Sequence, residues 1–147
     1  MTIKMRRRDP LLDLDLFAAC SHSEVAQARS LLTLLTVAPG TVLMAEGSYG
    51  YEFVVIAAGE ARVTVQTPDG ETLVAVLGRG DFAGEMSLLG DRRRTATVTA
   101  ATPLSFYVCN AAEFAGILEV APTIAERITR TAEARREANR DIERIAA

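Results

Sequence analysis

The strongest constraint on the fold is a regular alternation of turn signals and β-rich runs between residues 33 and 108. The turn signals all contain glycine and recur at short intervals: Pro39-Gly40, Glu46-Gly47, Ala58-Gly59, Pro68-Asp69-Gly70 and Gly78-Arg79-Gly80. The runs between and after them are rich in β-branched and aliphatic residues, and the clearest cover residues 42–44, 53–56, 61–65, 72–77, 95–99 and 104–108. Short strands separated by turns every 8–12 residues or so are typical of a sandwich or barrel. We therefore predict a mainly β fold, with a tight hairpin at Pro68-Asp69-Gly70.

Helical patterns flank the β-rich region on both sides. Apolar residues between positions 10 and 32 cluster and then fall on one helix face. After the last strand run, Asn110 offers a helix cap, and Pro122 suits the first turn of a final helix, where its missing N–H is not needed. We predict N-terminal helices and a C-terminal helix pair, the last helix covering about 122–147.

The predicted last helix carries a seam in which residues are spaced alternately by four and three positions, as in a coiled coil. The seam consists of Ile124, Ile128, Thr131, Arg135, Ala138, Ile142 and Ile145. It could pack on the body of its own chain or on a partner helix. A homodimer through Ile124, Ile128, Ile142 and Ile145 is therefore one possible assembly.

Length and composition exclude several classes of function. The chain has 147 residues, which fits a basic tail over 1–9 and a single domain over 10–147. Its formal net charge of −3 disfavours general nucleic-acid binding. One histidine, His22, and two cysteines offer no catalytic or metal-binding arrangement, so we expect no enzyme activity, metal or cofactor. Without a signal peptide or an apolar run of 18 residues, we expect a cytoplasmic protein with no membrane contact.

A segment without strand character, Gly80 to Leu89, interrupts the β-rich region. It opens with glycines and continues with a pattern typical of one helical turn. The N-terminus of a helix carries unpaired backbone N–H groups and partial positive charge. A glycine at that point lets an anion approach the backbone closely. Residues 84–87 are therefore a candidate cradle for a phosphate.

Two charged side chains complement the candidate cradle. Arg94 follows Gly84 by ten residues and could give a bidentate contact to phosphate oxygens. Glu85 should not face a phosphate, but it could accept hydrogen bonds from the hydroxyls of a ribose. Together they favour a nucleotide of low phosphate charge, such as a cyclic monophosphate. Each residue also has a simpler interpretation: Gly84 as a plain turn, Glu85 as a solvated carboxylate, and Arg94 as part of a solvent-facing arginine run over 92–94.

The segment from Phe82 to Leu89, followed by Arg94 to Val98, resembles the phosphate-binding cassette of the cyclic nucleotide-binding domain family. This family includes the catabolite activator proteins, the regulatory subunits of cyclic-nucleotide-dependent kinases, and gated channels. The glycine turns are similar in order and spacing, so the resemblance runs from about Leu16 to the last helix. The resemblance implies an antiparallel β-roll, or jelly roll, of about eight strands with flanking helices. Phe82-Ala83-Gly84 contains one residue more than the usual pattern, as in bacterial relatives.

The resemblance also assigns roles within the cassette. Glu85 would accept a hydrogen bond from the ribose 2′-hydroxyl, and Arg94 would pair with the cyclic phosphate. The backbone N–H groups that would complete the cradle belong to Gly84, Met86 and Ser87. Thr95 occupies a position where a hydroxyl can touch the phosphate and, in some relatives, favours guanine. It therefore leaves cAMP and cGMP both open, with cAMP preferred because bacterial members more often bind it.

The base of the nucleotide would lie against apolar strand residues and under the last helix. The candidate apolar contacts are Val63, Val74 and Leu77, which are equally compatible with a plain core. The candidate polar contacts on the last helix are Asn139 and Arg140, which are equally compatible with solvent exposure. A guanidinium could also stack on the purine face.

The resulting hypothesis is a stand-alone cyclic nucleotide sensor without catalytic activity, read by a separate effector protein. Occupancy would shift the last helix between a loose and a closed position. The last helix uses the residues after Pro122, which leaves none for a helix-turn-helix, so we expect no direct DNA binding. Two alternatives stay open: a ligand-free structural or dimerisation module, and a regulatory fragment of a larger enzyme.

Overall fold

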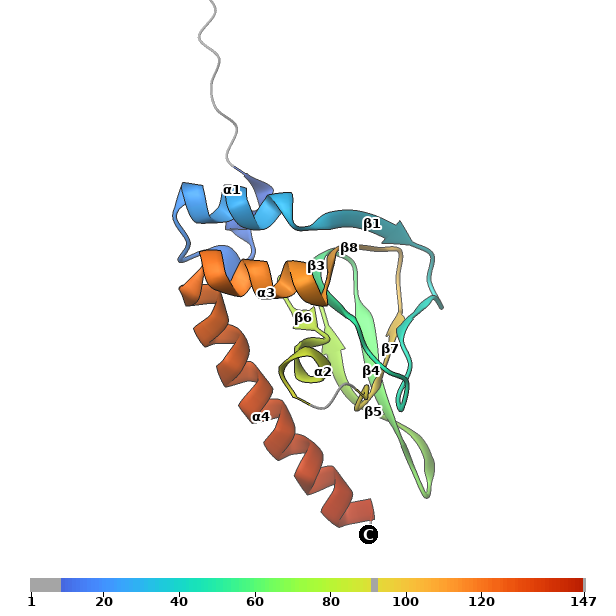
Figure 1. The fold of residues 1–147 in the computed structure, drawn as a ribbon. Coiled ribbons are helices and arrows are strands. Elements are labelled where there is room, and N and C mark those ends of the chain that lie inside the picture. The colour runs from blue at the N-terminus through green and yellow to red at the C-terminus, as the bar shows by residue number, and fades with distance from the viewer. Residues whose placement is uncertain (1–8, 91–92, 147) are drawn as a thin grey trace, which may run out of the picture.

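A computed structural model describes residues 9–90 and 93–146, with the side chains of the last helix described up to Asp141. The N-terminal part contains two 3-10 turns and one helix: η1 (Pro10–Asp13), η2 (Asp15–Phe17) and α1 (His22–Ser30). A short helix inserted into the β-rich region and two C-terminal helices complete the helical elements: α2 (Glu85–Leu89), α3 (Ala111–Val120) and α4 (Pro122–Ala146). Figure 1 shows α1 and α3 together at one end of the sheets, with α4 running from α3 past α2.

The β-rich region forms two four-stranded sheets of antiparallel pairs. The first sheet has the order β1 (Thr33–Val37), β8 (Leu104–Asn110), β3 (Glu52–Ala58) and β6 (Phe82–Ala83). The second has the order β2 (Val42–Met44), β7 (Thr97–Ala100), β4 (Ala61–Thr67) and β5 (Gly70–Leu77). Strands distant in sequence pair within each sheet, so the chain crosses repeatedly between the two. The predicted β-roll of about eight strands with flanking helices is confirmed.

The hairpin between β4 and β5 forms where the turn signal predicted it. Thr67 pairs with Gly70 across the turn, and the Thr67 hydroxyl donates to the Gly70 carbonyl at 3.0 Å. Gly70 has a φ of 108°, a conformation that residues with a side chain rarely adopt.

The strand predicted over residues 95–99 begins at Thr97 in the structure. The backbone of Arg94 is bonded to the turn at residues 47 and 48, which keeps this part of the chain away from β4.

The predicted helical pattern over residues 10–32 divides into η1, η2 and α1. The buried residues of the first part are Leu11, Leu12, Leu14, Leu16 and Phe17. In a straight α-helix these positions would be spread around the whole circumference, so two tighter turns bury them better. The helix α1 then begins with a capping box in which Ser21 accepts from the Glu24 N–H and Glu24 accepts from the Ser21 N–H.

A large apolar core joins the helices to the outside of the first sheet. It includes Leu11, Leu16 and Phe17 from the N-terminal turns, Phe53 from β3, Phe114 from α3, and Ile124 and Ile128 from α4. Ile124 and Ile128 have no solvent exposure within their own chain, so they cannot form the homodimer contact predicted for them. The physical reason is that the chain turns at Ala121 and lays the first half of α4 on this core. Ile142 and Ile145, the other two predicted dimer residues, lie outside the residues whose side chains are described.

The two cysteines are free thiols in different surroundings. Cys109 is buried in the core, and burial, with a smaller contribution from Glu113, raises its pKa to about 12. Burial also raises the pKa of the half-buried Cys20. Both side chains are therefore protonated at neutral pH and act as small apolar groups.

Two negative findings apply to residues 9–90 and 93–146. No helix there is long and apolar enough to cross a membrane. No group of three or more histidine, cysteine or acidic residues is arranged so that it could hold a metal ion.

Candidate functional site

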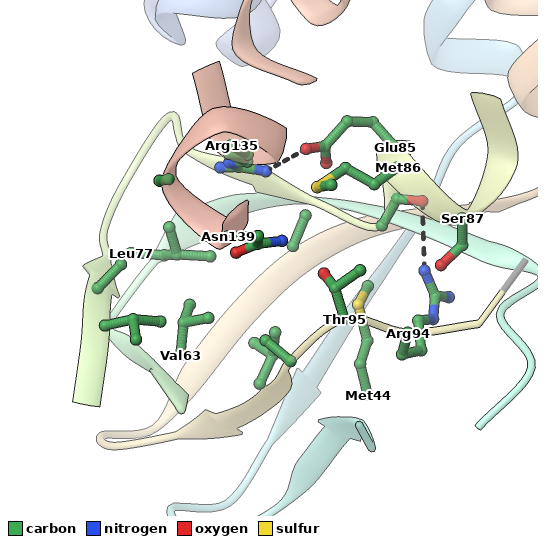
Figure 2. Close-up of a pocket in the computed structure, with 17 residues that line it drawn as sticks. Met44, Val63, Leu77, Glu85, Met86, Ser87, Arg94, Thr95, Arg135 and Asn139 are labelled. Carbon is green, nitrogen blue, oxygen red and sulfur yellow. Dashed lines mark hydrogen bonds and ion pairs between the residues drawn. The ribbon is translucent and has the colours of Figure 1, made fainter. Parts of the chain in front are cut away.

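A cavity of about 200 Å³ opens between the second sheet, α2 and α4 (Figure 2). Its wall is mostly apolar and includes Met44, Val63, Val74, Leu77, Ala83, Met86 and Val98. Its polar lining includes Glu85, Ser87, Arg94, Thr95, Arg135 and Asn139. The cavity thus combines an apolar wall with a few charged and hydroxyl groups, which is typical of a small-molecule site.

The cavity gathers the residues that the sequence singled out. The predicted cassette residues all line it: Gly84, Glu85, Met86, Ser87, Arg94 and Thr95. The predicted base contacts that line it are Val63, Val74, Leu77 and Asn139. Arg140 is exposed and is not among the lining residues. It follows Asn139 by one helix position, a rotation of about 100°, which takes it off the face that borders the cavity.

The start of α2 depends on a glycine. Gly84 precedes α2 with a φ of 99°, and no side chain caps this helix end. A Cβ at Gly84 would lie 2.3 Å from the carbonyl oxygen of Glu52 and 2.9 Å from a terminal nitrogen of Arg94. Both backbone conformation and space therefore require glycine. The first N–H groups of α2 lack partners within the helix, and they belong to residues that line the cavity.

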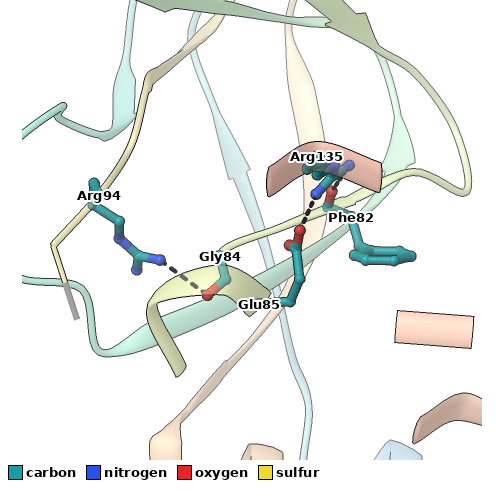
Figure 3. Close-up of polar contacts among 5 residues, drawn as sticks. All are labelled: Phe82, Gly84, Glu85, Arg94 and Arg135. Carbon is teal, nitrogen blue, oxygen red and sulfur yellow. Dashed lines mark hydrogen bonds and ion pairs between the residues drawn. The ribbon is translucent and has the colours of Figure 1, made fainter. Parts of the chain in front are cut away.

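Arg94 is held in place beside this turn. Only 7% of the residue is exposed. One terminal nitrogen donates to the Gly84 carbonyl oxygen at 3.2 Å (Figure 3), and the other donates to the Glu52 carbonyl oxygen at 2.7 Å. Burial lowers the pKa of Arg94, while the carboxylates of Glu52 and Glu85 raise it. A guanidinium carries five N–H groups, more than these two carbonyls accept. Arg94 can therefore present positive charge and further donors to an anion in the cavity.

Glu85 and Arg135 form an ion pair between α2 and α4. Glu85 is 1% exposed, and its Oε1 accepts from Arg135 at 2.6 Å. Arg135 also donates to the Phe82 carbonyl oxygen at 2.7 Å and lies 5.1 Å above the centre of the Phe82 ring (Figure 3). The second carboxylate oxygen of Glu85, Oε2, is buried and has no hydrogen-bond partner among the described residues. Such an acceptor is costly unless a donor reaches it, and a ligand hydroxyl is a suitable donor.

The arrangement suits the binding of a small molecule. It offers a buried guanidinium, a buried carboxylate oxygen without a partner in the described structure, and an apolar wall. These features suit a ligand with an anionic group, a hydroxyl donor and a flat apolar part.

Comparison with known proteins agrees with this chemistry. The family model of the cyclic nucleotide-binding domain matches residues 34–120. The chain belongs to the cyclic nucleotide-binding domain family. The match covers the strands and the cassette between β6 and β7, and domains of this family are regulatory rather than catalytic.

Relatives of this cyclic nucleotide-binding domain occur in several kinds of protein. The chain is 38% identical over 91 residues to a cAMP-dependent protein kinase regulatory subunit of Mycosarcoma maydis. The alignment covers 62% of this chain and 17% of that protein. It is 33% identical over 129 residues to the acetyltransferase Pat of Mycolicibacterium smegmatis, covering 88% of this chain and 38% of that protein. The chain therefore spans less than two-fifths of the length of both relatives.

A solved structure with a similar fold is the N-terminal domain of a transcriptional regulator from Streptomyces coelicolor. It aligns with a TM-score of 0.68 and 32% identity, over 92% of this chain and 94% of that domain. The likeness thus extends over nearly the whole cyclic nucleotide-binding domain, including elements outside the 34–120 match.

Arg135 is the principal site residue of this domain that the sequence did not predict. In the sequence it appears only as a weak member of the last helix's seam. The available signal is a charged residue at a seam position whose neighbours along the seam are Thr131 and Ala138. The structure explains why a charged residue occupies this seam position: at Arg135, α4 faces Glu85 and Phe82 instead of the apolar core.

Proposed function

We propose that this domain binds a cyclic nucleotide, cAMP in preference to cGMP, as a regulatory sensor without catalytic activity. The observation that carries the proposal is that Arg94 and the unpartnered carboxylate oxygen of Glu85 belong to one cavity (Figure 2). One group suits a phosphate with a single negative charge, and the other suits a neighbouring hydroxyl.

In the proposed complex, the cyclic phosphate lies against Arg94 and the backbone N–H groups at the start of α2. A guanidinium already fixed by two carbonyl oxygens loses little conformational entropy when it binds an anion. The ribose 2′-hydroxyl donates to Oε2 of Glu85, which otherwise has no partner in the described part of the chain. The ligand would thus satisfy a buried acceptor that the protein leaves open.

The base of the nucleotide lies against the apolar wall formed by Val63, Val74 and Leu77 in this proposal. Asn139, from α4, contributes an amide that can donate to a keto group or accept from an amino group. It therefore suits adenine and guanine alike, as does the hydroxyl of Thr95, an exposed residue. The preference for cAMP is supported by the likeness to a cAMP-dependent kinase regulatory subunit.

We expect cAMP to raise the thermal stability of the purified chain, and cGMP to raise it less. A ligand that binds only the folded state stabilises it by about 2.7 kcal/mol at a hundredfold excess over Kd. The measurement is thermal unfolding at a series of equal cAMP and cGMP concentrations, with calorimetry for the affinities. Linear 5′-AMP, which lacks the cyclic phosphate, is the control. No stabilisation by either cyclic nucleotide would exclude the sensor and leave the ligand-free structural module.

Occupancy is transmitted through α4 in this proposal. Arg135 joins α4 to Glu85 at 2.6 Å and to the Phe82 carbonyl, so the ligand-contacting carboxylate is also a helix contact. A ligand shifts a helix only if its affinity differs between the two helix positions. The contact of the ribose with Glu85, and of the base with Asn139 on α4, provides such a difference.

Replacing Arg135 with methionine is expected to uncouple α4 from the site. The variant keeps an apolar stem over Phe82 but loses both polar contacts of the guanidinium. Hydrogen exchange of the α4 amides over 132–141 should slow when cAMP binds the wild type, and this effect should be much smaller in Arg135→Met. Arg130→Met is the matched control, because Arg130 is exposed on the same helix and pairs only with an exposed Glu126 in the described structure. Equal cAMP effects in wild type and Arg135→Met would contradict transmission through this contact.

We further propose that residues 10–147 work as one domain in the cytoplasm, after a basic tail over 1–9, and that an effector protein reads the state of α4. The net charge of −3 gives no support to direct DNA binding. A regulatory part of a larger enzyme is the second candidate, favoured by the alignment of 88% of this chain with an acetyltransferase.

A further inference from the structure

The segment from Gly47 to Glu52, which leads into β3, contacts Arg94 at both of its ends. The Gly47 N–H donates to the Arg94 carbonyl oxygen at 2.8 Å, and the Arg94 N–H donates to the Ser48 carbonyl oxygen at 2.7 Å. At the other end of the segment, the Glu52 carbonyl oxygen accepts from the Arg94 guanidinium at 2.7 Å. The same six residues therefore fix both the backbone and the side chain of Arg94.

Gly50, in the middle of this segment, lies directly against the Arg94 side chain. Gly50 is buried, and a Cβ built on it would lie 2.2 Å from Nε, 2.3 Å from Cζ and 2.7 Å from Cδ of Arg94. Real Cβ contacts essentially never fall below 3.0 Å. The guanidinium thus occupies the space that a side chain at Gly50 would need.

The backbone conformation of Gly50 does not itself require glycine. Gly50 is not among the glycines with positive φ, in contrast to Gly47 and Gly84. The requirement comes from Arg94, which supplies the three atoms nearest to the added Cβ. That neighbour cannot move aside freely, because it is 7% exposed and a shift would break its bonds to the Gly84 and Glu52 carbonyl oxygens.

We propose that Gly50 is a positioning residue for ligand binding: its missing side chain leaves the space that the Arg94 guanidinium occupies when it meets the phosphate. This inference rests on the proposed binding of a cyclic nucleotide. Any side chain at Gly50 displaces the guanidinium from its two carbonyl partners and from the ligand. Gly50 acts only through Arg94 and needs no contact with the ligand itself.

A double-mutant cycle tests the proposal, with Gly50→Ala, Arg94→Ala and the double variant. Calorimetry should show that Gly50→Ala weakens cAMP binding at least tenfold, whereas in the Arg94→Ala background the same change alters affinity less than threefold. Without nucleotide, Gly50→Ala should lower the unfolding temperature of the wild type more than that of Arg94→Ala. The reason is that the added methyl group meets no guanidinium in the Arg94→Ala background. Gly78→Ala is the matched control, since no described atom lies within 4 Å of its added Cβ and its φ is not positive.

The proposal is overturned if Gly50→Ala binds cAMP as the wild type does, or if its effects are equal in both backgrounds. Equal effects in the two backgrounds would mean that Gly50 matters for the local backbone and not for the position of Arg94. If the wild type binds no cyclic nucleotide, the proposed function fails, but the unfolding measurements still decide whether Gly50 positions Arg94. Should Arg94→Ala not fold, a crystal structure of Gly50→Ala decides the same point. A guanidinium displaced from the Gly84 carbonyl supports the proposal, and an unmoved guanidinium overturns it.

Discussion

Replacing Arg94 with alanine is expected to weaken cAMP binding by about tenfold to more than a hundredfold. A hydrogen bond to a charged group contributes roughly 1.5–3 kcal/mol, and the guanidinium is the buried cation of the cavity's described lining. It is also fixed in advance by the Gly84 and Glu52 carbonyl oxygens, so the ligand does not have to order it. Calorimetric titration of the variant with cAMP measures the loss.

Two controls separate the role of Arg94 in binding from its role in the fold. Arg94→Lys keeps a positive charge but not the planar guanidinium, so its affinity should fall between those of the wild type and Arg94→Ala. Arg62→Ala removes an exposed arginine of β4 that does not line the cavity, and its affinity should match the wild type. A folded Arg94→Ala variant with unchanged cAMP affinity would overturn the assignment of the phosphate site.

The strands and turns of the fold could be predicted from the sequence because their signals are local, whereas their arrangement as a β-roll was implied by the family resemblance. The turn at Pro68-Asp69-Gly70 places a glycine where the chain adopts a φ of 108° between two paired strands. The cap at Asn110 and the proline that begins α4 are equally local, and both lie where they were predicted. Such features depend on the backbone preferences of one or two residues, which the sequence displays directly.

The gathering of the cassette residues around one cavity could be predicted because their chemistry is unusual for a strand-to-strand connection. Gly84, Glu85 and Arg94 combine a turn, an acid and a base within eleven residues. The ion pair of Glu85 with Arg135 could not be predicted in this way, because the two residues are fifty positions apart and Arg135 has the spacing of a seam. Gly50 was missed for a similar reason: its neighbour is Arg94, forty-four positions further along the chain.

The seam of α4 shows how one periodic pattern can serve two environments. Ile124 and Ile128 are fully buried against the helices and the first sheet, as a seam predicts. About two and three turns beyond Ile128, Arg135 and Asn139 meet the cavity instead. Periodicity identifies the inner face of a helix, but what that face meets depends on the tertiary structure. The pattern therefore could not distinguish packing on the chain's own body from packing on a partner.

Replacing Glu85 with alanine is expected to weaken cAMP binding by about tenfold or more while leaving the affinity for 2′-deoxy-cAMP nearly unchanged. The reason is that Oε2 of Glu85 is the buried acceptor for which the described residues offer no donor, and the 2′-hydroxyl is the proposed donor. In the wild type, 2′-deoxy-cAMP should therefore bind about as weakly as cAMP binds to the variant. Calorimetry with both nucleotides on both proteins measures the coupling between the carboxylate and the hydroxyl.

The two-nucleotide design is needed because Glu85 also holds Arg135. Glu85→Ala also removes the Oε1 contact at 2.6 Å. If the loss of this contact to α4 were what weakens binding, the affinities for both nucleotides would fall by the same factor. Only the lost hydroxyl contact affects cAMP and spares its deoxy analogue. Glu119→Ala, which removes an exposed carboxylate of α3, should change neither affinity. If Glu85→Ala weakens cAMP and 2′-deoxy-cAMP by the same factor, Glu85 acts through Arg135 and the helix, and the ribose contact is wrong.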